Sequence, residues 1–167
     1  MDPGRVEEGP AMDGWLLREA SEADAETVAA LLRAAFEEYR GKLDPPSGAH
    51  NETAELVREK LEYSRAVLAL AGEVPAGCVF YETPEGYTYF SRLAVLPAYR
   101  RRGLARALIE YVEEQARALG RPRVRLGVRL ALPRQRTYYE RLGYRAIHAL
   151  THAGYTEPTY LMLEKQL

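Results

Sequence analysis

The sequence predicts an α/β (α+β) fold with a mixed sheet of about seven strands. Short apolar segments typical of strands alternate along the chain with segments whose apolar residues recur at the helical period. Clusters of proline and glycine separate these segments, as expected of turns. With 167 residues, of which 47% are hydrophobic, the chain can bury one sizeable core but is short for two. We therefore expect one domain at residues 14–167 and a disordered leader at residues 1–13, which carry proline, glycine and acidic side chains.

The first half of the chain is predicted to form one strand, two helices and then three strands. Ser21 and Asp24 make a near capping box, which predicts that a helix begins there. The Pro-Pro and Ser-Gly pairs at residues 45–48 break regular structure, so a loop should precede the second helix, which begins at Asn51 or Thr53. The predicted ranges are 15–19 (strand), 21–39 and 51–63 (helices), then 65–71, 76–83 and 87–96 (strands), with hairpin turns at 72–75 and 84–86.

The second half is predicted to form a long helix, a strand, a short helix and two strands. Gly120 and Pro122 end the long helix, while Pro133 lies in the first turn of the short helix and Gly143 just past its end. Because a helix connects the strand at 87–96 to the next strand, these two strands should be parallel, with a right-handed crossover. The predicted ranges are 104–119 (helix), 124–128 (strand), 133–142 (helix), and 145–150 and 159–163 (strands).

An arginine-rich turn between the strand at 87–96 and the long helix is built to hold a phosphorylated ligand. The first amides of a helix have no intrahelical partner and lie at the positive end of its dipole, so an anion there meets several donors. Gly103 lets the backbone approach a ligand, and arginine adds charge and fork-shaped donors. The candidate binding residues in this turn are Arg100, Arg101, Arg102, Gly103, Leu104, Ala105 and Arg106.

Several other classes of site are not supported. The sequence contains neither G-x-x-x-x-G-K-[ST] nor G-x-G-x-x-G, so Walker-type and dinucleotide-binding sites are excluded. Three scattered histidines and one cysteine, Cys78, form no metal-ligand spacing, and Cys78 lies in an apolar segment as a small buried hydrophobe. A net charge of −1 argues against a nucleic-acid partner. We expect a cytoplasmic protein without a membrane partner, because no apolar run reaches the roughly 18 residues of a membrane span.

Two motifs together resemble the GCN5-related N-acetyltransferase (GNAT) superfamily. The pattern Arg100-x-x-Gly103-x-Ala105, after a strand ending Leu-Ala-Val-x-Pro, is similar to its acetyl-CoA pyrophosphate loop. The segment Tyr139-Glu140-x-x-Gly143 with flanking aromatic residues is similar to the helix end that the family places beside the cofactor sulfur. The order of predicted elements matches the family over about residues 14 to 167, and the chain resembles a bacterial subgroup of unknown acceptor.

The resemblance implies helices on both faces of the sheet and a splayed parallel strand pair, with the pantetheine arm of acetyl-CoA between the two strands. Backbone groups of Leu93 and Val95, with Ala94 between them, would then hold the arm. Tyr139 would act as the general acid that protonates the departing thiolate. Tyr138 and Gln135 would also line the cofactor site, with Gln135 and Leu132 standing where the family often has alanine and asparagine.

The acceptor side of the site is defined by the same resemblance. Transfer to an amine with a pKa of about 10.4 requires a general base or a water chain near neutral pH. Candidate bases are Glu82, Glu38 and His152, with ordered water as the alternative to all three. The substrate wall would include Phe36 and Tyr39, whose aromatic rings, together with acidic neighbours, suit a cationic amine.

The expected function is transfer of an acetyl group from acetyl-CoA to a primary amine of a small molecule or peptide. The alternative is a non-catalytic module of the same fold that binds CoA or another phosphate. The sequence does not determine the oligomeric state, and a homodimer is one of the states it allows.

Overall fold

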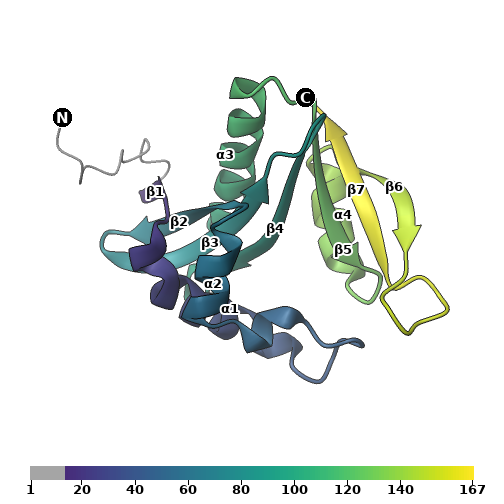
Figure 1. The fold of residues 1–167 in the computed structure, drawn as a ribbon, viewed down its shortest axis with the longest axis horizontal. Coiled ribbons are helices and arrows are strands. Elements are labelled where there is room, and N and C mark those ends of the chain that lie inside the picture. The colour runs from purple at the N-terminus through teal and green to yellow at the C-terminus, as the bar shows by residue number, and fades with distance from the viewer. Residues whose placement is uncertain (1–13) are drawn as a thin grey trace. The chain divides into compact units, whose positions relative to one another are not determined.

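The structure, a computed structural model, describes residues 14–167; the leader predicted at residues 1–13 lies outside the described residues. Two compact units make up the described chain. We call residues 14–82 and 92–111 the N-terminal unit, and residues 83–91 and 112–167 the C-terminal unit. The strands form one seven-stranded sheet in the order β1-β2-β3-β4-β5-β7-β6, and β4 contributes residues to both units (Figure 1). The predicted mixed α/β sheet is therefore confirmed.

The N-terminal unit contains an antiparallel meander. Strand β1 (Trp15–Glu19) pairs with β2 (Arg65–Ala71), and β2 pairs with β3 (Val74–Glu82). The end of β4 (Thr88–Val95) is tied to β3 by a 2.9 Å hydrogen bond from the Leu96 amide to the Ala76 carbonyl.

The start of β3 differs from the sequence prediction, which placed it at residue 76. The strand begins at Val74 because the hairpin turn needs only Gly72 and Glu73, with Gly72 at a φ of +62°. A register shift next to Leu70 then admits Pro75 into the pairing. Proline is compatible with the start of a strand, where a missing N–H costs little.

Two helices of the N-terminal unit follow β1, and the structure sharpens both predictions. The first region divides into a 3-10 turn at Glu22–Asp24, helix α1 (Ala25–Phe36) and a second 3-10 turn at Glu37–Tyr39. Helix α2 (Ala54–Lys60) is capped by Thr53, whose hydroxyl accepts from the Leu56 amide at 3.2 Å. This capping bond selects Thr53 over Asn51 as the start of the helix. Between α1 and α2 lies a 3-10 turn at Gly48–Asn51.

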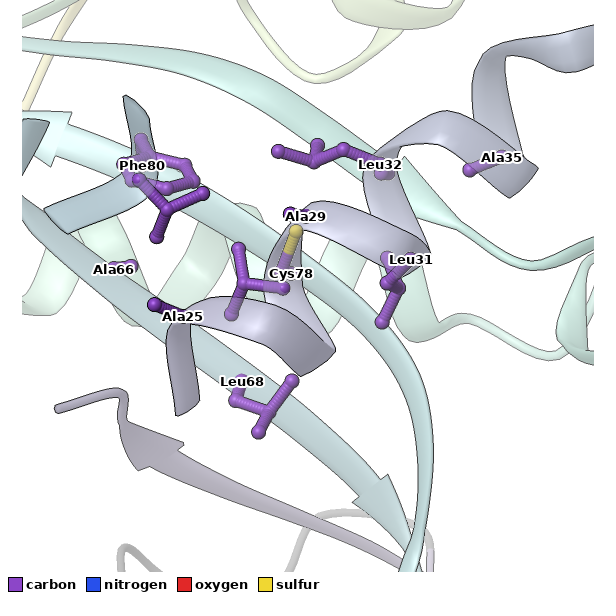
Figure 2. Close-up of a cluster of buried hydrophobic side chains, with 12 residues drawn as sticks. Ala25, Ala29, Leu31, Leu32, Ala35, Ala66, Leu68, Cys78 and Phe80 are labelled. Atoms are coloured by element: carbon purple, nitrogen blue, oxygen red, sulfur yellow. The ribbon is translucent and has the colours of Figure 1, made fainter. Parts of the chain in front are cut away.

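Helix α1 covers one face of the meander with small and branched side chains (Figure 2). Ala25, Ala29 and Leu32 are fully buried. They pack with Cys78 and Phe80 of β3. Burial raises the pKa of the Cys78 thiol to about 12, so it stays protonated at neutral pH. The prediction that Cys78 is a small buried hydrophobe is confirmed.

A second helix covers the opposite face. Successive side chains of a strand point to opposite faces, so Gly77 faces away from the α1 cluster that Cys78 joins. A Cβ on Gly77 would lie 2.8 Å from the Ala94 carbonyl oxygen and 3.3 Å from Leu104 of α3 (Leu104–Ala118). Glycine is therefore required where β4 and the start of α3 approach β3. Helices lie on both faces of this part of the sheet, as predicted.

The C-terminal unit is built on β5 (Arg123–Arg129) and β7 (Tyr160–Gln166), which pair in antiparallel register along their whole length. Strand β6 (Arg145–Leu150) pairs with the other edge of β7, and helix α4 (Pro133–Arg141) packs on β5 (Figure 1). The register of β4 with β5 is parallel and joins Thr88 to Val124 and Tyr89 to Arg125. The predicted parallel pairing of these two strands is therefore confirmed.

The carboxylate of Asp24 makes the first testable contribution to stability. Arg18 donates to both of its oxygens at 2.8 Å, and the Ser21 amide donates to it at 2.8 Å. The hydrogen bond from Arg18, followed by that from Ser21, holds the Asp24 pKa below its usual value despite partial burial. A depressed carboxyl pKa stabilises the fold above the unfolded value near 4, and this stabilisation is lost as the pH falls through the folded value.

We therefore expect Asp24→Asn to lower the free energy of unfolding at pH 7 by about 2 kcal/mol. The difference from the wild-type protein should shrink below about pH 4 in urea unfolding curves recorded across pH. Glu22→Gln, in the same 3-10 turn, is the matched control. A difference that stays constant from pH 7 to pH 2 would contradict the role of this carboxylate.

Candidate cofactor and catalytic site

The turn between β4 and α3 contains two residues with a left-handed backbone. It begins with a 3-10 turn at Pro97–Tyr99, and the φ angles are then +63° at Arg101 and +81° at Gly103, with Arg102 between them in the ordinary negative range. Left-handed residues on either side of an ordinary one are typical of an anion-binding nest, in which successive amides face one concavity, and we call residues 101–103 the nest. The Gly103 carbonyl accepts from the Ala107 amide at 3.0 Å, so the amides of the first turn of α3, at residues 104–106, have no intrahelical acceptor.

The space in front of this nest is open. A Cβ built on Gly103 has no heavy atom of the described chain within 4 Å. Glycine is thus demanded here by its positive φ and not by packing within the protein. Leu104 is buried and fixes the start of α3, whereas Ala105 is half-buried and small. Gly103 is therefore exposed at the helix start, with no side chain of the described residues packed against it.

Arg100 is held by the protein itself. Its Nε donates to the Val95 carbonyl at 3.0 Å, and its Nη2 donates to the Ala35 carbonyl at 3.0 Å. Its Nη1 pairs with Glu38 at 2.5 Å. The guanidinium thereby joins the end of β4 to the end of α1 and to the turn after it. We interpret Arg100 as a positioning residue that sets where the nest lies.

The remaining arginines of the turn are exposed and more loosely engaged. Arg102 stacks 5.9 Å from the Tyr99 ring centroid, and Arg106 pairs with Glu110 one helical turn later at 2.9 Å. No bond is described for the Arg101 guanidinium within residues 14–167. These side chains surround the nest with positive charge.

The strand that leads into the turn contains a second left-handed residue. Arg92 has a φ of +54°, and its Nε donates to Glu52 at 3.1 Å. Glu52 is 2% exposed and also accepts from Lys60 at 2.5 Å. Leu93, Ala94 and Val95 follow this irregularity, with Ala94 buried and its two neighbours half-buried. Sequence analysis missed Glu52, which no motif marks.

Tyr139 belongs to the C-terminal unit, where α4 presents it to an aromatic cluster. Its side chain is 8% exposed and packs against Phe90 and Tyr144, with ring centroids 6.2 Å apart in each case. Tyr144 is fully buried, its hydroxyl has no hydrogen-bond partner within residues 14–167, and burial raises its pKa. Tyr138 is 36% exposed, and Gln135 lies one helical turn before Tyr139 on the same helix. Tight packing fixes the ring of Tyr139.

The candidate acceptor residues have different surroundings. Phe36 and Tyr39 make an edge-to-face pair with centroids 6.0 Å apart. Glu38 is engaged by Arg100, as described above. Glu82 is the last residue of β3. The end of β4 meets β3 near its other end, at Ala76. The structure therefore does not bring Glu82 to the arginine-rich turn.

His152 lies in the loop between β6 and β7, within the C-terminal unit. Its Nδ1 contacts the Thr159 hydroxyl, its amide donates to the same hydroxyl at 3.0 Å, and its ring lies 4.7 Å from the Tyr160 ring centroid. Desolvation, and secondarily Arg129 of β5, lower its pKa below 6.5. His152 is therefore a neutral, well-oriented imidazole at neutral pH.

Comparison with known proteins identifies the family of the chain. The model of the Acetyltransferase (GNAT) family matches residues 26–144, and the chain belongs to that family. No protein of curated function matches the sequence. The fold and the family make the chain an acyltransferase whose cosubstrate is acetyl-CoA.

Solved structures share the fold at low sequence identity. The PaiA N-acetyltransferase of Thermoplasma acidophilum in complex with coenzyme A superposes with a TM-score of 0.77 at 17% identity, covering 92% of this chain and 99% of that one. The ribosomal-protein-S18-alanine N-acetyltransferase of Escherichia coli gives 0.74 at 16% identity, covering 91% and 93%. A GNAT family acetyltransferase of Elizabethkingia anophelis with acetyl-CoA bound gives 0.68 at 17%, covering 93% and 100%.

The positioning role of Arg100 predicts a specific order of effects. Arg100→Met leaves two carbonyls and Glu38 without their donor, so it should lower the free energy of unfolding by about 2 kcal/mol and weaken CoA binding at least tenfold. Arg101→Met removes only an exposed, salt-screened charge and should weaken binding less. Urea unfolding and isothermal titration calorimetry with CoA measure both effects. A larger affinity loss in Arg101→Met than in a folded Arg100→Met protein would refute the positioning role.

Proposed function

We propose that this enzyme transfers an acetyl group directly from acetyl-CoA to a primary amine of a small molecule or peptide, with Tyr139 as the general acid. The observation that carries the proposal is the pair of left-handed residues Arg101 and Gly103 at the start of α3, next to first-turn amides that have no intrahelical acceptor. A second support is the short helix α4, which carries the nearly buried side chain of Tyr139 in an aromatic cluster.

The cofactor side of the proposal rests on the donor set of the turn. The amides of the nest and of residues 104–106 suit the pyrophosphate, because each donates to an anion without a competing intrahelical acceptor. Arg101, Arg102 and Arg106 supply the surrounding positive charge. Backbone groups of Leu93 and Val95 are proposed to hold the pantetheine arm, with Gln135 and Tyr138 lining it from α4.

The chemical side assigns separate tasks to the residues. Acetyl-CoA supplies a thioester carbonyl that an unprotonated amine can attack. Tyr139 is proposed to donate its phenolic proton to the departing sulfur. A backbone amide near Val95 is proposed as the donor that stabilises the negative charge on the carbonyl oxygen.

The acceptor side remains open to several amines. Phe36 and Tyr39 are proposed to contribute aromatic surface, with Glu38 and Arg100 as a charged pair beside them. One structural neighbour acts on the alanine of a ribosomal protein, which supports peptide amines as one acceptor class for this enzyme. We place the enzyme in the cytoplasm. Among residues 14–167, no helix has both the length and the apolar character that crossing a membrane requires.

The role of Tyr139 predicts a selective loss of turnover. Tyr139→Phe keeps the ring and its packing, so stability and CoA affinity should stay near wild-type values while kcat falls about 10²- to 10⁴-fold. Single-turnover acetyl transfer, monitored by release of CoA, measures the chemical step.

The matched control is Tyr144→Phe, which removes a hydroxyl without a described partner from the same aromatic cluster. It should leave turnover unchanged. If Tyr139→Phe transfers acetyl groups within about twofold of the wild-type rate, the hydroxyl of Tyr139 is structural and the proposed acid is wrong.

A further inference from the structure

The contacts of the His152 ring define which nitrogen carries its proton. Thr159 Oγ1 is approached by two groups from His152, the backbone amide at 3.0 Å and the ring Nδ1. It also lies 3.5 Å from the Leu150 carbonyl, which can only accept. A hydroxyl has one proton to donate and two lone pairs to accept with. All contacts are satisfied when the hydroxyl donates to Leu150 and accepts from both the amide and Nδ1–H of His152.

This arrangement directs the reactive nitrogen of the ring away from Thr159. With the proton on Nδ1, the lone pair of a neutral imidazole is on Nε2. No bond to Nε2 is described within residues 14–167, and the side chain is half-buried and in contact with solvent. The short hydroxyl contact and the packing on Tyr160 fix the direction in which Nε2 points.

The surroundings of the ring lower its pKa. Strand β5 contributes the cation Arg129, β7 contributes the Tyr160 ring at 4.7 Å, and the loop itself contributes the Tyr155 ring at 6.4 Å. Partial desolvation is the largest cause of the lowered pKa, and the positive charge of Arg129 adds to it. The imidazole is thus neutral at neutral pH, with the lone pair of Nε2 unprotonated.

His152 also lies at the correct end of its unit for a role in transfer. Arg129, the last residue of β5, pairs with Tyr160, the first residue of β7, beside which His152 stacks. Helix α4, which carries Tyr139, begins four residues after Arg129. The carboxyl end of β5 therefore brings together the loop of His152 and the start of the helix of Tyr139.

We propose that Nε2 of His152 is the base that deprotonates the acceptor, and that the acceptor is an α-amino group and not a lysine-type side chain. This inference rests on the acetyl transfer proposed above. In the step, Nε2 takes one proton from the ammonium, after which the amine nitrogen forms the new C–N bond and the C–S bond breaks. Tyr139 gives its proton to sulfur and regains one from the new amide nitrogen, while the imidazolium releases the first proton to solvent.

The preference for an α-amino group follows from matching the base to the ammonium. An α-ammonium has a pKa of about 7.7 to 8.0, so transfer of its proton to an ordinary imidazole, with a pKa of about 6.5, is unfavourable by roughly 15- to 30-fold. The lowered pKa of His152 makes the transfer less favourable for every amine alike. A lysine-type ammonium, with a pKa of about 10.4, makes the same transfer unfavourable by roughly 10⁴-fold. An imidazole is thus a competent base for the first class of amine and a poor base for the second.

The test compares two acceptor sets and three proteins across pH. The acceptors are short peptides with a free N-terminus and no lysine, and the same peptides with a blocked N-terminus and one lysine. The proteins are wild type, His152→Gln and His148→Gln, the last being an exposed histidine on the neighbouring strand β6. Nitrogen NMR of the imidazole reports the Nδ1–H tautomer and its titration independently of turnover.

We expect wild type to prefer the free N-terminus and kcat/KM to rise with pH through a value below 6.5. His152→Gln should lose about 10²-fold or more in kcat/KM together with this acidic limb, and added imidazole should restore part of the rate. Calorimetric affinity for CoA should be unchanged in His152→Gln, and His148→Gln should match wild type.

Three results would overturn the inference, and each contradicts a different part of it. A folded His152→Gln enzyme with wild-type rates and the same pH profile would eliminate His152 as the base. A His152-dependent enzyme that prefers the lysine peptides would contradict the α-amino assignment. If wild type binds CoA but acetylates neither set, the proposed transfer to peptide amines fails as well.

Discussion

The position of the candidate site depends most on the three contacts that the Arg100 guanidinium makes within the protein. The guanidinium joins the last residue of β4, the last turn of α1 and Glu38 through three separate nitrogens. A guanidinium can do this because its planar fork of five donors is rigid and permanently charged. Without it, the turn that follows β4 would have no side-chain anchor to the helix layer, and the direction of the nest amides would not be fixed.

Two left-handed residues flank this anchor, and one of them, Arg92, is held by an ion pair. Arg92 and Arg101 have positive φ angles, which cost non-glycine residues of order 1–2 kcal/mol each. Arg92 is held by Glu52, which Lys60 also contacts, and Arg101 directly follows the anchored Arg100. Buried pairs of this kind contribute little net stability but fix geometry. We interpret the strain as the cost of presenting β4 and its turn in a conformation ready to bind a ligand.

The sequence predicted the order of elements well because turn chemistry and periodicity are local. Strands β1, β2 and β6 have their predicted bounds, since each is an apolar segment with clear breaks on both sides. The start of β3 was missed because the pairing admits Pro75 through a register shift that only the partner strand imposes.

The side-chain partners in the site were much harder to predict. The motif indicated that Arg100 faces a phosphate, whereas its guanidinium is used inside the protein, because the carbonyls it contacts lie 65 and 5 residues away in sequence. Glu52 was equally hard to predict, because its partner Arg92 lies 40 residues away in sequence. Motifs identify which residues gather, but the direction of a long side chain depends on tertiary neighbours that the motif does not contain.

The central claim is that the backbone nest between β4 and α3 binds the pyrophosphate of CoA. The most direct test is the increase in the free energy of unfolding that CoA and its fragments produce. CoA at about 100 times its dissociation constant should stabilise the protein by roughly 2.7 kcal/mol, because it binds only the folded state. At the same concentration, pantetheine and adenosine, which both lack the pyrophosphate, should stabilise it far less. Equal stabilisation by CoA and by either fragment would contradict the assignment of the nest.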